Sequence, residues 1–189
     1  MDASLTKSGA RYKLALERHL PHSPKKVWRV VTEKQFLHQW FPAHVLGEWK
    51  VGAALRFEFQ HGEGDQLSDE ELRGEVLAVE PERLLEFRWG KHILRCELIP
   101  DGDGCRLLFS ESFEDASSGA RNAAGWELCL QNLELLLEGA AIAKFVLGAW
   151  RVRFEHYVAK FQPQFGPQQG PPDTHPDVVA EKTRQGQRE

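Results

Sequence analysis

The sequence predicts an α+β domain in which a long helix covers one face of an antiparallel sheet. Several short segments between residues 46 and 113 alternate apolar and polar side chains, and tight turns join them. Strands that are connected in this way pair antiparallel. The stretch 118–139 follows them with apolar residues at helical spacing, and such a helix must bury that face against another element.

Composition limits the classes of partner and site. The chain has 189 residues and a formal net charge of −4, so it lacks the basic surplus typical of proteins that bind nucleic acid. Its three cysteines show no paired spacing, which argues against a disulfide framework or a zinc ribbon. No apolar run approaches the roughly 20 residues that cross a membrane, and no apolar leader is visible, so we expect a cytoplasmic protein without a membrane span.

The N-terminal part is predicted to supply one strand and two helices. Residues 1–10 are polar and are expected to form a flexible N-terminus. Residues 12–20 alternate as a half-buried strand does. Ser23 followed by Pro24 is a typical helix start, and Thr32 is the expected cap of a second, shorter helix.

The middle of the chain is predicted to supply the remaining strands. They are expected within the strand-rich stretch 46–60, where Gly52 suggests a bend or bulge, and at 72–79, 84–89, 92–99 and 105–113. Gly90-Lys91 and the run from Pro100 to Gly104 are turn signals typical of hairpins, so we expect successive strands to be neighbours.

The long helix should end at Gly139, and the chain then changes character. The predicted organisation is a flexible N-terminus at 1–10, a main domain at 11–140, a helical extension at 141–162 and a disordered Pro/Gln-rich tail at 163–189. Whether the extension continues the long helix or forms a separate one stays open. Its aromatic side chains would also suit pairing with a second copy, so a homodimer is a candidate assembly.

Five motifs carry a family resemblance. They are, in this order, SPKKVWRVVTEKQFLHQWF, KVGAALRFEF, LRGEVLAVEPERLLEFRW, GWELCLQNLELLLEG and EHYVAKFQPQFG, and in the last one Gln162 replaces the glycine of the family pattern. Their order and spacing resemble the SRPBCC (START-like, birch-pollen-allergen-like) superfamily, and within it the heat-shock-protein-90 ATPase activator homologue-like domains. The resemblance covers about residues 12–140. It implies a helix-grip fold, in which a curved antiparallel sheet wraps around the long C-terminal helix and leaves a cavity.

The residues that face this cavity would decide the function. The ligand-cavity candidates are aromatic rings, the apolar face of the long helix and one carboxylate: Trp28, Trp40, Phe57, Phe59, Trp89, Phe109, Glu111, Trp126, Leu130 and Leu133. The alternative for each ring is that it simply fills the core. Glu111 shares a strand face with Phe109 and Phe113, where a carboxylate needs a partner such as an arginine. A bulge that turns Glu111 to solvent is the alternative.

Three functions remain open. The first is binding of a small hydrophobic or amphipathic molecule in the cavity. The second is a chaperone-associated, ATPase-activator-type interaction domain, and the third is a cyclase- or hydrolase-like enzyme; both are implied by the resemblance. No nucleophile motif, metal-ligand spacing or phosphate loop occurs, so no catalytic residue, metal or cofactor is predicted. A non-enzymatic role is therefore favoured.

Overall fold

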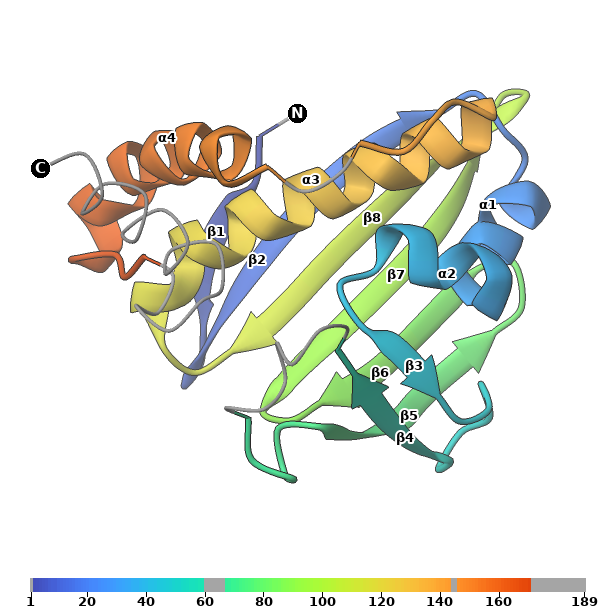
Figure 1. Ribbon diagram of the computed structural model, residues 1–189, viewed down its shortest axis with the longest axis horizontal. Helices are drawn as coiled ribbons and strands as arrows, with labels where there is room; N and C mark the ends of the chain where they lie inside the picture. Colours follow the sequence, from blue (N-terminus) through green and yellow to red (C-terminus); the bar gives the residue numbers. More distant parts are fainter. Residues whose placement is uncertain (1, 60–66, 144–145, 171–189) are drawn as a thin grey trace, which may run out of the picture. The chain divides into compact units, whose positions relative to one another are not determined.

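The computed structural model describes residues 2–59, 67–143 and 146–170 (Figure 1). These residues divide into two compact units. The sheet unit comprises residues up to 115 together with 129–143, and the helical unit comprises 116–128 together with residues from 144 on. Helix α3 (Gly119–Glu138) contributes its first half to the helical unit and its second half to the sheet unit.

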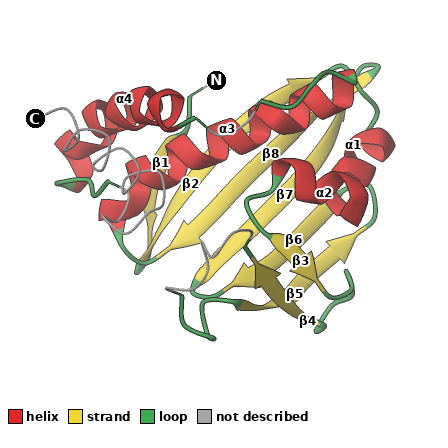
Figure 2. Ribbon diagram, viewed as in Figure 1, coloured by secondary structure: helices red, strands yellow, loops and turns green. Residues whose placement is uncertain are grey.

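The sheet unit is organised around one antiparallel sheet of eight strands (Figures 1 and 2). The strands are β1 (Ser4–Ser8), β2 (Arg11–Leu20), β3 (His44–Leu46), β4 (Ala54–Glu58), β5 (Arg73–Glu80), β6 (Leu84–Trp89), β7 (His92–Asp101) and β8 (Gly104–Phe113). Their order across the sheet is β1-β2-β8-β7-β6-β5-β4-β3. The α+β antiparallel layout predicted from the sequence is thus confirmed. Among the strands that the structure describes, only β2 and β8 pair across a long stretch of sequence.

One face of the sheet is buried, as strand β8 shows most clearly. Every second side chain of this strand is buried, from Cys105 to Phe113. Phe109 lies directly opposite Leu16 of β2 and Cys96 of β7, and all three are buried. Because directly opposed residues of antiparallel strands share a face, the core continues across the strands.

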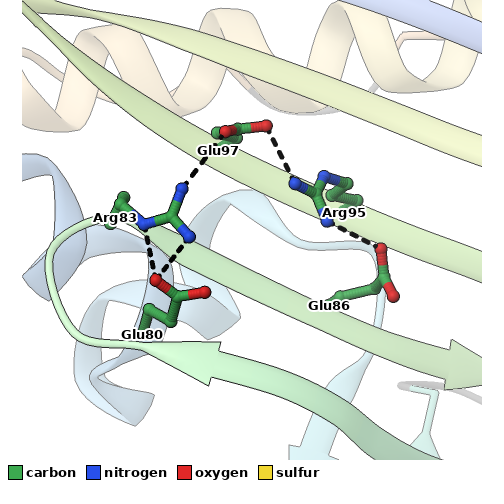
Figure 3. A network of polar contacts seen from close by, with 5 residues as sticks. All are labelled: Glu80, Arg83, Glu86, Arg95 and Glu97. Atoms are coloured by element: carbon green, nitrogen blue, oxygen red, sulfur yellow. Dashed lines mark hydrogen bonds and ion pairs between the residues drawn. The ribbon is translucent and has the colours of Figure 1, made fainter.

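The other face carries charged side chains that pair with one another (Figure 3). Arg95 of β7 contacts Glu86 at 3.1 Å and Glu97 at 3.0 Å. Glu97 also contacts Arg83 at 3.5 Å, and the Arg83 Nε donates to Glu80 at 2.6 Å. Solvent screens part-exposed pairs of this kind, so this network gives modest support to the pairing of β5 to β7, and its five charges are already paired with one another.

One strand prediction needs correction: the sequence predicts flexible residues 1–10, whereas β1 pairs with β2 over its whole length. The stretch 46–60, predicted to be strand-rich with a bend at Gly52, is divided into β3 and β4. The chain turns between them at Gly47 and Gly52, which have positive φ, and a Cβ at Gly47 would lie 2.6 Å from the Ala54 carbonyl oxygen.

Two short helices pack within the sheet unit. Helix α1 (Pro24–Thr32) begins as predicted, with the Ser23 hydroxyl accepting from the Lys26 N–H. Helix α2 (Lys34–Trp40) follows without a side-chain cap. The predicted capping role of Thr32 is wrong, because Thr32 is the last residue of α1 and its hydroxyl donates to the Trp28 carbonyl at 2.7 Å.

The second half of α3 ends at Gly139, as predicted. Gly139 has φ of +71°, and its N–H and that of Ala140 donate to the Leu136 and Leu135 carbonyls. The Lys26 Nζ donates to the Leu137 carbonyl at 2.7 Å, so α1 satisfies a further carbonyl of the last turn.

His22 beside this contact should make stability depend on pH. Its Nδ1 lies 3.2 Å from Lys26 Nζ, and burial and the Lys26 ammonium lower the pKa of His22 below 6.5, against a smaller opposing effect of Glu138. The folded state therefore favours the neutral ring, so its stabilising contribution is complete above pH 6.5. That contribution should be lost as the pH falls from 6.5 through the lowered pKa. Urea unfolding across this range should show that the free energy of unfolding falls more steeply with decreasing pH in the unmodified chain than in His22→Gln. Equal pH dependence in the two proteins would contradict the lowered pKa of His22.

The helical unit contains a helix separate from α3. Helix α4 (Leu147–Phe165) buries Trp150, Tyr157 and Phe161, so three of the aromatic side chains that suggested a homodimer are covered within the chain, whereas Phe154 is half-buried. The homodimer stays a prediction. The helix extends three residues beyond 162, and most of the predicted tail, 171–189, lies outside the described residues. Among the helices that the structure describes, none is long and apolar enough to cross a membrane.

Glu127 joins the first half of α3 to α4. The Tyr157 hydroxyl donates to its carboxylate at 2.6 Å, and the Arg153 Nε donates at 3.2 Å. Tyr157 is completely buried, so its hydroxyl needs hydrogen-bond partners within the fold, and Glu127 is one of them.

Replacing Tyr157 by phenylalanine should lower the free energy of unfolding by about 1.5–3 kcal/mol, because the ring stays and a hydrogen bond to a charged group is lost. Urea denaturation of the two proteins measures the difference. Glu127→Gln is the matched variant: its amide oxygen still accepts from the hydroxyl, so it should cost less. A loss below about 0.5 kcal/mol in Tyr157→Phe would contradict the role of this contact.

Candidate functional site

The buried face of the sheet carries a stacked aromatic cluster around Phe57. Its ring lies 4.6 Å from that of Trp89, at an interplanar angle of 15°. Phe87 and Phe41 lie 6.1 and 6.4 Å from Phe57, and Phe59 lies 5.7 Å from Trp89. We call these five residues the aromatic cluster; distances of this size suit favourable ring contacts.

Gly74 of β5 makes this stacking possible. It lies opposite Trp89 of β6 and Leu55 of β4. A Cβ on Gly74 would lie 2.7 Å from the Phe57 ring and 2.0 Å from the Arg88 carbonyl oxygen. Only a residue without a side chain fits there, so the glycine in LRGEVLAVEPERLLEFRW is explained by packing.

The aromatic cluster has a closed interior and a more accessible edge. Phe57 is completely buried, and Phe41 and Phe87 are buried as well. Trp89 and Phe59 are only half-buried. These two rings are therefore the part of the cluster that another molecule can reach.

Glu111 and His92 form a polar pair on the same face. Glu111 is 4% exposed and lies directly between Leu14 and Leu94 on the neighbouring strands. Its Oε1 lies 2.7 Å from the Nδ1 of His92. His92 is two residues before Leu94 on β7 and directly opposite Trp89, so it shares the buried face and adjoins the aromatic cluster. The alternation of β8 thus places Glu111 on the buried face, and a histidine is a partner of its carboxylate.

The other predicted residues occupy several elements. Trp40 of α2 is buried and its indole N–H donates to the Val30 carbonyl at 2.9 Å, whereas Trp28 of α1 is half-buried. Phe109 is buried in β8. Leu130 and Leu133 are completely buried in the second half of α3. Trp126 is buried in the first half of α3, which belongs to the helical unit.

Three residues of this face were missed as ligand candidates. Phe87 lies between Leu85 and Trp89 in the β6 alternation, so its strand position was a usable signal. Phe41 and Trp49 lie outside the strands and gave no comparable signal; the Trp49 ring lies 5.3 Å from Phe87, and its N–H donates to the Thr32 carbonyl.

A surface depression of about 330 Å³ lies elsewhere on the sheet unit. It is lined by His19, Leu20, Pro21, Asp101, Asp103, Gly104 and Cys105. None of the predicted ligand-cavity residues contributes to it. The depression lies at the β7–β8 hairpin, and none of its lining residues belongs to the aromatic cluster.

The described residues give little support for metal or thiolate chemistry. Within residues 2–59, 67–143 and 146–170, no group of three or more His, Cys, Asp or Glu side chains is placed to hold a metal ion. All three cysteines are free. Burial raises the pKa of the Cys96 thiol to about 12, so this group stays protonated at neutral pH.

Comparison with protein families assigns the domain. Residues 21–138 match the sequence pattern of the family described as activator of Hsp90 ATPase homolog 1-like protein. The chain belongs to this family. The match includes α1, α2, the strands from β3 to β8 and α3, and therefore the aromatic cluster, Glu111 and His92. A comparison with curated proteins finds no match.

Solved structures of other proteins have the same fold. A conserved protein of unknown function from Enterococcus faecalis, EF2215, is 24% identical, covers 85% of this chain and 91% of its own, and gives a TM-score of 0.69. CalU16 from Micromonospora echinospora is 20% identical, covers 84% and 93%, and gives a TM-score of 0.64. DynU16, a protein in the dynemicin biosynthetic locus, is 25% identical, covers 70% of this chain and 49% of its own, and gives a TM-score of 0.59. The helix-grip fold of the family is thus shared by this chain.

Proposed function

We propose that this chain binds a small hydrophobic or amphipathic molecule on the buried face of the sheet, between the aromatic cluster and the second half of α3. The observation that carries the proposal is the half-buried edge formed by Trp89 and Phe59 beside the polar pair. Ligand sites combine mostly apolar and aromatic walls with a few placed polar groups. This face has both components.

Two further observations support a small-molecule ligand. Leu130 and Leu133 add an apolar helical wall to the sheet unit. DynU16, similar in fold, comes from a locus for the biosynthesis of dynemicin, so one protein with this fold is associated with small-molecule chemistry. Fold alone does not define specificity, so the ligand class must be found by experiment.

A ligand screen tests the proposal. The purified chain would be mixed with a panel of flat aromatic, steroid-like and fatty-acyl compounds and examined by thermal shift and native mass spectrometry. We expect at least one class to raise the melting temperature and to give a one-to-one complex, because a ligand that binds only the folded state stabilises it. If no class does either, the proposal fails.

A variant pair locates the site. Phe59→Ala removes a half-buried ring of the cluster edge and should weaken binding of the compound found by roughly three- to tenfold. Val152→Ala removes an exposed side chain from α4 and should leave the affinity unchanged. Equal affinities of the two variants would place the ligand elsewhere.

The family description favours a second candidate, stimulation of a heat-shock ATPase through a protein interface. The test is the rate of ATP hydrolysis by purified heat-shock protein 90 with and without this chain. A concentration-dependent rise in rate would support this function, and an unchanged rate would count against it. The two candidates make independent predictions, because the ATPase assay contains no small ligand of this chain.

A further inference from the structure

The burial of Glu111 calls for an explanation. The residue lies between two completely buried leucines, Leu14 and Leu94, in the middle of an otherwise apolar strand face. Removing a carboxylate from water is costly unless hydrogen bonds replace its hydration. An apolar side chain would fit the alternation of β8 without that cost. We therefore attribute the position of this carboxylate to its contact with His92.

Glu111 orients the imidazole ring of His92. With the Glu111 carboxylate ionised, which can only accept hydrogen bonds, the Nδ1 of His92 at 2.7 Å is the donor of this contact. In the neutral ring the Nε2 is then left as an acceptor. Among the residues that the structure describes, no side chain or backbone group donates to this Nε2.

The pair extends from the interior towards an accessible ring. The Glu111 side chain is 6% exposed, whereas that of His92 is 39% exposed. The His92 ring stacks against Phe113 at 6.1 Å and 28°, which fixes its plane. This is the arrangement in which a buried carboxylate positions an imidazole and leaves the second nitrogen for another molecule.

The acceptor adjoins the accessible edge of the aromatic cluster. His92 and Trp89 are directly opposed residues of the β6–β7 hairpin, so their side chains leave the same face. A flat ring that stacks on Trp89 and Phe59 would bring a substituent on its edge towards the Nε2. The Nε2 accepts a hydrogen bond, so the substituent that it recognises must donate one. A hydroxyl group is a small substituent that can do so.

We propose that His92 and Glu111 bind the hydroxyl group of a flat aromatic ligand, with the Nε2 of His92 accepting the hydrogen bond and Glu111 positioning the ring. This inference rests on the proposed function, since the ligand occupies the same face. It narrows the ligand class to phenol-like compounds. It also supplies the polar group that neither the sequence motifs nor the aromatic cluster provide.

The test compares two probes of similar size, 2-naphthol and 2-methoxynaphthalene, by isothermal titration calorimetry. Only the first can donate a hydrogen bond from its oxygen. The unmodified chain should bind 2-naphthol roughly tenfold more tightly. His92→Phe, which keeps a ring on Phe113, should reduce this ratio to about one.

Variants of the positioning residue separate its role from a structural one. Glu111→Gln keeps an oxygen that accepts from Nδ1–H and should keep most of the ratio. Glu111→Leu suits the apolar face but leaves the imidazole tautomer unfixed, so the ratio should fall to roughly threefold or less. The matched control is His19→Phe: His19 also contacts carboxylates, Glu17 at 3.3 Å and Asp101 at 3.7 Å, but on the opposite face of the sheet. It should retain the full ratio.

The outcomes distinguish the two proposals. Equal binding of both probes to the unmodified chain overturns the role of His92 and leaves the proposed function standing. An unchanged ratio of the two affinities in His92→Phe would also overturn the role of His92 and leave the proposed function standing. Failure of both probes to bind overturns the inference and, for aromatic ligands, the proposed function with it.

Discussion

Replacing Gly74 by alanine is expected to lower the free energy of unfolding by about 3 kcal/mol, at the upper end of what overpacking usually costs. The new Cβ would lie 2.0 Å from the Arg88 carbonyl oxygen, and this oxygen belongs to the backbone of the neighbouring strand. It would also lie 2.7 Å from the Phe57 ring. Neither group can withdraw without loosening β5 from β6 or breaking the stack with Trp89. Urea denaturation followed by circular dichroism measures the loss.

The same substitution at Gly125 is the matched control. A Cβ there meets nothing within 4 Å, and the residue lies inside α3. Alanine favours a helix over glycine, so Gly125→Ala should raise stability by about 0.5–1 kcal/mol. We therefore expect the free energy of unfolding to fall in Gly74→Ala and to rise in Gly125→Ala. A neutral Gly74→Ala would show that β5 and β6 are not packed as described.

Replacing Phe57 by alanine is expected to cost about 3–5 kcal/mol. The ring is completely buried and stacks within 6.4 Å of Trp89, Phe87 and Phe41. Its removal would leave a cavity at the centre of the cluster, because the strand β6 holds Phe87 and Trp89 in place and Phe41 lies at the end of α2. The free energy of unfolding from urea titration provides the measurement.

Val51→Ala serves as the comparison for Phe57. Val51 is 60% exposed and lies in the turn before β4, so its truncation should change stability by less than about 0.5 kcal/mol. If Phe57→Ala costs no more than about 1 kcal/mol, the cluster does not form a packed core. The ligand proposals would then lose their aromatic wall as well.

The strands were predictable because period-two alternation is a strong local signal. The prediction of 84–89 matches β6 at both ends, and the turns at Gly90 and Gly102 have the positive φ that their residues allow. The same alternation places Glu111 on the buried face correctly. What alternation cannot supply is the hydrogen-bond partner of Glu111, because the pattern gives the face of each strand and not which side chains on that face contact one another.

There are physical reasons why the sequence pattern did not predict some features of the structure. Strand β1 is composed of polar residues around one buried leucine, Leu5, and is stabilised by its pairing with β2 more than by its own pattern. The packing of α4 depends on the contacts of Glu127 with Arg153 and Tyr157, which no local pattern announces. Trp40 was a ligand candidate by type, but its indole N–H bonds to the α1 backbone, so it has a structural task already.

The pairing of β2 with β8 sets the order in which the protein can form on the ribosome. Leu20 of β2 is paired with Cys105, so the strand must wait until most of the domain has been synthesised. At usual rates of synthesis the delay is on the order of 5–15 s. During this interval Leu14 and Leu16, which are later buried, remain without the strand that covers their free edge. The nascent chain is thus most prone to aggregate before its last strand emerges.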